Sequence, residues 1–172
     1  MAIYIRWAEA KDLPAMMAII AQAKQLLKSD GSPQWQDGHP NEEMFKADIA
    51  QKRAYVLIVG QEVAGVAVLQ TTPELSYVQI DGAWRNSTMP YATIHRIAFS
   101  DKYRGQHLGQ IFISNLLSRG QFLGFHNFRI DTHALNKRMQ GLIKKVGYHY
   151  CGIIHVNPTS DGARYAYELN LA

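Results

Sequence analysis

Apolar and polar residues alternate at the start of the chain, where Ile3, Ile5 and Trp7 fall on one side of a predicted half-buried strand. The next apolar positions follow helical spacing between Asp12, a suitable N-cap, and Gly31, which ends the element. These positions are Leu13, Met16, Met17, Ile20 and Leu27. The pattern therefore predicts an opening strand followed by an amphipathic helix.

A loop at 32–40 (SPQWQDGHP) separates this helix from a shorter one, for which Asn41 is the predicted cap and Lys52 the approximate end. Two apolar runs follow, Ala54–Val59 and Val63–Leu69, with three residues between them. Runs that are so closely spaced predict an antiparallel hairpin.

No regular pattern crosses residues 71–90, because two prolines and a glycine interrupt it. The stretch Tyr91–Phe99 then predicts a strand. Helical spacing resumes at Leu108, and we expect that helix to break at Gly120 or Gly124.

The last part of the chain predicts a strand at 128–132, a helix at 136–146 closed by Gly147, and two strands at 148–156 and 163–171. A strand, a helix and a strand in succession favour a parallel strand pair within residues 91–132. We therefore predict one mixed α/β domain spanning residues 1–172.

Composition narrows the class of protein. The chain has 172 residues, of which 47% are hydrophobic, too many for a disordered chain. Its longest apolar stretch, Ala15–Ala21, is far shorter than the ~20 residues of a membrane span. With no leader pattern and a single cysteine, Cys151, we expect a cytoplasmic protein without a disulfide. The net charge of +4 leaves nucleic acid, an acidic ligand or no special partner open.

The segment 91–110 carries the clearest chemical signal, because a strand ends, a short basic loop follows and a helix begins at once. The first N–H groups of a helix lack intrahelical partners and lie at its positive end, where they bind anions. Gly105 and Gly109 allow an anion to approach the backbone closely, although they equally suit a tight turn and helix packing. Neither a P-loop nor a dinucleotide-binding glycine motif is present.

This loop resembles the signature [QR]-x-x-G-x-[GA] of the GCN5-related N-acetyltransferases (GNAT). It reads Arg104–Gly105–Gln106–His107–Leu108–Gly109, with His107 where the family usually has glycine. Asn136 and the later Lys145–Val146–Gly147–Tyr148 resemble a second family element. The resemblance implies a mostly antiparallel sheet with a splayed parallel strand pair, flanked by helices.

The resemblance also implies that acetyl-CoA is the co-substrate and a small-molecule or protein amine the acceptor. The backbone of the first splayed strand would bind the pantetheine arm and polarise the thioester carbonyl, the loop amides would bind the pyrophosphate, and the amine would attack directly. The implied cofactor-binding residues are Ile97, Ala98, Phe99, Arg104, Gly105, Gln106, His107, Leu108, Gly109, Gln110 and Asn136.

Direct transfer requires a group that removes a proton from the acceptor ammonium. His95 precedes the arm-binding residues, and an imidazole is suited to proton transfer near neutral pH, so it is the first candidate base; a half-buried structural histidine is the alternative. Asp131 and His133 are second choices. Ile143 occupies the place of the tyrosine that often serves as the family's general acid.

Trp35 and Tyr77 are candidate walls of the acceptor pocket, although packing over the first helix is an equal reading for Trp35. No metal site is predicted, because the seven histidines lack ligand spacing. A homodimer is possible.

A non-catalytic acyl-CoA-binding or regulatory module is the alternative function. A nucleic acid partner is not expected, because no basic cluster with interleaved aromatics occurs, and a membrane partner is not expected, because the apolar stretches are short. The segment 101–145 holds eight basic and only two acidic residues. The positive surplus therefore coincides with the predicted site for a polyanionic cofactor.

Overall fold

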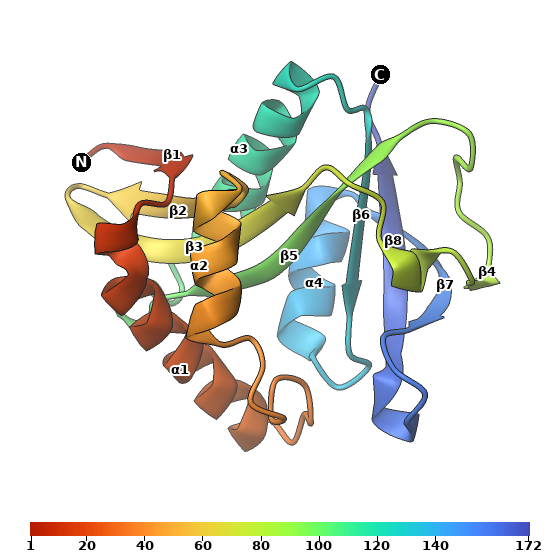
Figure 1. Cartoon of the computed structure of the whole chain (residues 1–172), viewed down its shortest axis with the longest axis horizontal. Helices are drawn as coiled ribbons and strands as arrows, with labels where there is room; N and C mark the ends of the chain where they lie inside the picture. Colours follow the sequence, from red (N-terminus) through yellow and green to blue (C-terminus); the bar gives the residue numbers. More distant parts are fainter.

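The computed structural model describes residues 1–172 and contains one mixed eight-stranded sheet with helices on both faces (Figure 1). The strands run in the order β1-β2-β3-β5-β6-β8-β7-β4. Their bounds are β1 Ile3–Trp7, β2 Ala54–Val59, β3 Glu62–Gln70, β4 Asp81–Gly82, β5 Tyr91–Phe99, β6 Asn127–Thr132, β7 His149–His155 and β8 Ala163–Asn170. The predicted mixed α/β class is confirmed, as is the antiparallel hairpin of β2 and β3.

Helices α1 (Leu13–Ser29) and α2 (Glu42–Ala50) lie in front of the sheet in Figure 1, and α3 (Leu108–Phe122) and α4 (Lys137–Val146) lie behind it. Each pair covers its own apolar cluster. The cluster under α1 and α2 includes Met16, Ile20 and Phe45, and that under α3 and α4 includes Phe112 and Ile143. No helix is both long enough and apolar enough to cross a bilayer.

The helix ends follow the predicted caps with one exception. The Asn41 side chain accepts a hydrogen bond from the Met44 N–H at 3.0 Å, and Gly147 closes α4 in the left-handed conformation with φ 110°. Asp12 precedes α1 as predicted, but its carboxylate binds Arg6 at 2.7 Å instead of the helix N–H groups. A charged partner on β1 therefore replaces the expected cap.

Of the two predicted breaks of helix α3, the later one is confirmed: the helix passes Gly120, continues to Phe122, and is followed by Gly124 in the left-handed conformation with φ 94°. Gly120 lies against the ring of Phe128 on β6, where a Cβ atom would approach the ring to 2.3 Å. The glycine therefore allows close approach between helix and strand and does not terminate the helix.

Strands β5 and β6 are the predicted parallel pair, yet they pair only from Tyr91 to Thr93 against Asn127 to Arg129. Beyond these residues the two strands diverge. Strand β5 also carries a register shift against β3, and Arg96 at that point has φ 50°. The remainder of β5 is thus paired with β3 on one side only, and its other side is open.

Residues 71–90 are ordered by contacts with distant parts of the chain. The buried Arg129 guanidinium lies 4.0 Å from the ring centre of Trp84 and 3.9 Å from that of Tyr91, and its Nε donates to Glu168 at 2.8 Å. Glu168 also accepts the N–H of Asn86 at 2.8 Å. These contacts fix the segment over β6 and β8, where it forms one wall of the site described next.

Candidate functional site

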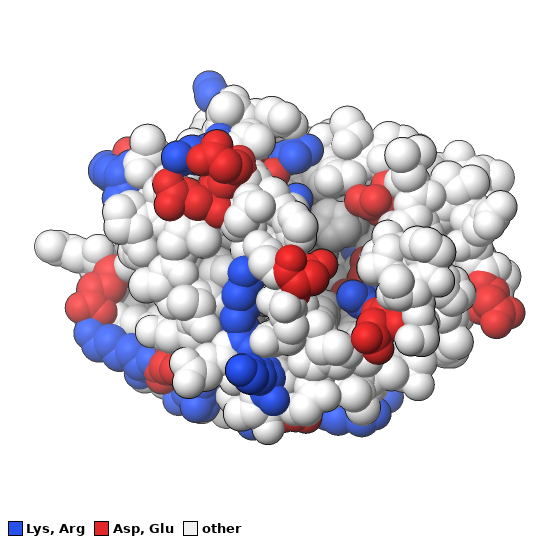
Figure 2. Space-filling model, turned by 60° about the horizontal axis from the view of Figure 1, so that its bottom comes forward, with Lys and Arg blue, Asp and Glu red and all other residues white.

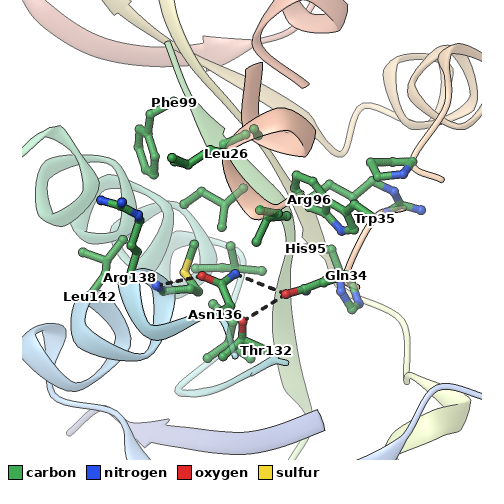
Figure 3. Close-up of a pocket in the computed structure, with 18 of the residues that line it drawn as sticks. Leu26, Gln34, Trp35, His95, Arg96, Phe99, Thr132, Asn136, Arg138 and Leu142 are labelled. Atoms are coloured by element: carbon green, nitrogen blue, oxygen red, sulfur yellow. Dashed lines mark hydrogen bonds between the residues drawn. The ribbon is translucent and has the colours of Figure 1, made fainter. Parts of the chain in front are cut away.

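A cavity of about 890 Å³ opens where β5 and β6 diverge (Figure 3). Its walls come from the end of α1, the loop at 32–40, strand β5, the loop before α3, the N-terminal part of α4 and the segment around Glu74. The diverging strands β5 and β6 and the ends of helices α1, α3 and α4 therefore enclose one cavity.

The structure brings most of the predicted cofactor-binding residues to this cavity. Those that line it are Ile97, Ala98, Phe99, Arg104, Gly105, His107, Leu108, Gly109 and Asn136. Gln106 and Gln110 lie outside the lining. Most residues of the motif at 104–109 and the open side of β5 thus face the same cavity, although a short 3-10 turn at 101–103 separates them in the chain.

The N-terminus of α3 borders this cavity, and no side chain caps it. His107 occupies the N-cap position with φ 57° and makes no capping hydrogen bond, and no acidic residue lies in the first turn. Histidine is one of the non-glycine residues that tolerate this left-handed conformation. The substitution for the usual glycine is therefore compatible with the loop shape, which leaves the helix end free to bind an anion.

The two glycines of the motif have different roles. Gly105 has φ 80° and nothing near its missing Cβ, so it provides an open turn. A Cβ atom on Gly109 would lie 2.8 Å from the Leu142 side chain, so this glycine permits close packing between α3 and α4. The tight turn and the helix packing that the sequence suggested are thus found at Gly105 and Gly109, respectively, and the approach of an anion to this loop stays a prediction.

Basic residues around the loop are largely neutralised by acidic neighbours. Arg104 pairs with Asp101, Arg138 with Asp30 at 2.8 Å, and Lys102 with Glu62 at 2.5 Å. Figure 2 shows basic and acidic side chains next to one another over this face of the molecule. The local field of the segment 101–145 is therefore weaker than its residue count suggests.

Asn136 joins α4 to the loop at 32–40. Its Oδ1 accepts from the Met139 N–H at 3.2 Å, and its Nδ2 donates to Gln34 Oε1 at 3.2 Å. Figure 3 shows Gln34 also directed at Thr132 on β6. The same loop places Trp35, which lines the cavity and also packs against the cluster under α1; its role as a wall of the acceptor pocket stays a prediction.

His95 lines the cavity from β5 and contacts a carboxylate that the sequence did not suggest. Its Nε2 lies 3.1 Å from Glu74 Oε2, and both side chains are about three-quarters buried. The hydrogen bond to His95 lowers the pKa of Glu74 to about 2, so Glu74 is a carboxylate at neutral pH. A histidine held by a fixed carboxylate has the arrangement of a general base and its orienting group.

The other predicted residues have clear positions. Tyr77 is buried outside the cavity lining, and its hydroxyl donates to Asp131 at 2.6 Å. Asp131 lines the cavity, so Tyr77 supports its wall from behind. His133 does not line it; its Nδ1 accepts the Leu135 N–H at 3.1 Å, and burial lowers its pKa.

Gln34, Glu74 and Arg164 are polar cavity residues that the sequence analysis did not identify. None belongs to a motif. Glu74 lies in the segment without a pattern, and Gln34 lies in a loop whose only prominent residue is the neighbouring tryptophan. No local signal in the sequence distinguishes them from ordinary polar loop residues.

The chain is similar to proteins of one family. The sequence model of the Acetyltransferase (GNAT) family matches residues 20–148. An acetyltransferase of the GNAT family from Streptococcus agalactiae is 34% identical, with TM-score 0.90 over 99% of this chain and 96% of that chain. None of the curated proteins matches the chain.

Two further solved structures share the fold at lower identity. A GNAT-family acetyltransferase from Listeria monocytogenes is 19% identical, with TM-score 0.75 over 98% of this chain and 95% of that chain. The ribosomal-protein-S18-alanine N-acetyltransferase from Escherichia coli is 20% identical, with TM-score 0.63 over 99% of this chain and 95% of that chain. These two likenesses concern the fold alone.

Proposed function

The chain belongs to the GNAT acetyltransferase family, and we propose that it transfers an acetyl group from acetyl-CoA to the nitrogen of a primary amine. One observation carries the proposal. The open side of β5, the uncapped N-terminus of α3 and the His95–Glu74 pair all face the same cavity of about 890 Å³. A binding site for a phosphate-bearing ligand and a candidate base therefore share one space.

Residues of this cavity fit acetyl-CoA. The first N–H groups of α3 and the open turn at Gly105 would hold the pyrophosphate, and the unpaired side of Ile97–Phe99 would hold the pantetheine arm. Bound there, acetyl-CoA would supply the acetyl group as a thioester whose carbon–sulfur bond breaks as the new carbon–nitrogen bond forms. Since a thiol of the cysteine type has a pKa of ~8.5, the leaving sulfur needs no strong acid.

His95 would remove the proton from the acceptor ammonium. A neutral imidazole that donates from Nε2 to Glu74 keeps a lone pair on Nδ1, and that nitrogen can accept the proton. The Glu74 carboxylate then stabilises the imidazolium that forms. Asp131 also lines the cavity, and a carboxyl side chain there is suited to a cationic amine.

A non-catalytic acyl-CoA-binding module remains the second candidate, and one observation favours it. Ile143, in the place of the family's usual tyrosine, is fully buried and offers no proton donor. The Tyr103 hydroxyl, which is in the cavity wall, is held by Glu62 at 2.5 Å. A protein without an acid can still transfer acetyl groups if the thiolate leaves unaided, so the two candidates differ in their measured turnover.

The experiment measures release of the CoA thiol from acetyl-CoA in the presence of a panel of primary amines. We expect thiol release with at least one amine, and a His95→Gln rate ~10²–10⁴-fold lower at saturating acetyl-CoA with an unchanged acetyl-CoA Kd. His149→Gln, an exposed histidine outside the cavity, is the matched control and should keep full activity.

Tight acetyl-CoA binding without thiol release from any amine would support the non-catalytic candidate. Equal turnover of the wild type and His95→Gln between pH 6 and 8.5 would remove His95 from the mechanism.

A further inference from the structure

Arg164, near the start of β8, is a cation of the cavity wall without a carboxylate partner. Four arginines line the cavity. Arg96, Arg104 and Arg138 each lie within ion-pair distance of an aspartate, whereas no carboxylate lies within 4.0 Å of the Arg164 guanidinium. An arginine of this kind is available to a ligand.

The hydrogen bonds of Arg164 occupy only one of its three guanidinium nitrogens. Nη1 donates to the carbonyl oxygens of Asp161 at 2.5 Å and Ala163 at 2.9 Å, which fix the side chain against its own turn. Nε and Nη2 donate to no protein group. Burial lowers the pKa of this guanidinium, and the more distant Asp131, Asp161 and Asp37 oppose the decrease. A partly desolvated cation with free N–H groups is stabilised by an anion that reaches it.

The sheet places Arg164 on the side of the proposed base. Asp131 on β6 is opposite Ala166 on β8, so Arg164, two residues before Ala166, lies on the same face of the sheet as Asp131. Tyr77 links this face to β5, because its hydroxyl binds Asp131 and its ring centre lies 6.4 Å from that of His95. Helices α3 and α4, with the proposed phosphate site, cover the opposite face. Arg164 is therefore separate from the residues proposed to hold the phosphates.

We propose that Arg164 binds a carboxylate of the acceptor, so that the acceptor is an amino-acid-like small molecule with both an amine and a carboxylate. The proposal rests on the proposed function, since it names the substrate class of the same site. A guanidinium matches a carboxylate with two parallel N–H donors, and Nε with Nη2 provides such a pair. Asp131, on the same face, is suited to the ammonium end of such a zwitterion. The cavity wall thus offers one charge of each sign on the acceptor side.

The test compares each standard L-amino acid with its own primary carboxamide as acceptor. For at least one amino acid, we expect the wild type to give a kcat/KM ~10–100-fold higher than for the amide, as a charge-assisted hydrogen bond provides. Arg164→Gln should abolish this preference by lowering the value for the amino acid alone, and Arg164→Lys should retain part of it. Arg85→Gln removes an exposed arginine outside the cavity and should leave the preference intact.

Acetyl-CoA affinity reports whether the variants keep their fold, because Arg164 is not among the residues proposed to bind it. An equal loss of kcat/KM for amino acids and amides in Arg164→Gln, or a wild type without preference for the carboxylate, would overturn the proposal.

If no amine is acetylated, the proposed function fails, and calorimetry with the same amino acids and CoA-loaded protein decides the binding question. Binding of an amino acid that is lost in Arg164→Gln supports the proposed site, and absence of binding refutes it.

Discussion

Two helical glycines should respond oppositely to alanine, because one lies against a buried ring and the other in open space. Gly120 of α3 packs on Phe128, whose side chain is fully buried in β6. A Cβ atom there would lie 2.3 Å and 2.6 Å from two ring carbons, whereas ordinary contact begins at 3.4 Å. Gly141 of α4 has nothing within 4 Å of its missing Cβ. Comparing alanine at Gly120 with alanine at Gly141 therefore separates the effect of packing on stability from the effect of helix propensity.

The expected magnitudes follow from these distances. Alanine in place of a helical glycine contributes up to ~1 kcal/mol to the free energy of unfolding, and Gly141→Ala should gain most of it. Gly120→Ala gains the same but must separate helix and strand by about an ångström, and such overpacking costs ~1–3 kcal/mol. The contact is deep enough for the upper end of that range, so we expect a net loss of ~1–2 kcal/mol for Gly120→Ala.

Urea unfolding followed by circular dichroism measures both variants against the wild type. With a slope of ~2 kcal/mol per molar urea, the midpoints of the two variants should differ by ~1 M. A Gly120→Ala protein as stable as Gly141→Ala would show that Phe128 moves aside without cost. That result would refute the explanation that Gly120 is needed because α3 packs closely on β6.

Substitutions at two further residues, Glu74 and His107, test the base and the loop. Glu74→Gln should lower the free energy of unfolding by ~1 kcal/mol at pH 5, since a fall in pKa from 4.5 to about 2 would amount to ~3 kcal/mol if the pair were not partly screened by solvent. The pKa of Glu74 is lower in the folded than in the unfolded chain, so this stabilisation is complete above pH 4.5 and decreases as the pH falls toward 2. Urea unfolding at pH 5 and pH 3 measures it, and an equal difference between wild type and Glu74→Gln at both pH values would contradict the expectation. His107→Gly should change stability by less than ~0.5 kcal/mol, because relief at φ 57° offsets the greater freedom of the unfolded chain. His107→Val should cost at least ~1 kcal/mol in the same measurement, and equal stability of the two variants would remove the left-handed strain from the explanation.

Local patterns predicted most of the elements because their causes are local. Alternation marked β1, two closely spaced apolar runs marked the hairpin of β2 and β3, and single residues such as Asn41 and Gly147 marked helix ends. The segment 71–90 could not be predicted, since its order depends on Arg129 and Glu168 from strands far along the chain. Long-range ion pairs leave no periodic trace in the sequence.

The residues of the site likewise fall into those that local sequence could predict and those that it could not. The loop before α3 could be identified because an anion site at a helix N-terminus consists of consecutive residues. Glu74 and His95 are 21 residues apart, and Gln34 and Asn136 are 102 residues apart, so these contacts exist only in the folded chain. His95 itself could be proposed from its position on a strand, but the carboxylate that orients it could not.

One irregularity in β5 explains how the base and the open backbone reach the same cavity. In a regular strand, residues three apart lie on opposite faces. Ile94 and Ile97 nevertheless both pack in the cluster under α3 and α4, because the register shift at Arg96, with φ 50°, changes the phase of the strand between them. His95 therefore stays on the face of the sheet that carries Asp131 and Arg164, while Ile97 and Phe99 pack toward α3 and α4. The spacing of the two isoleucines is the one trace of this bulge in the sequence, since two core residues three positions apart do not fit an unbroken strand.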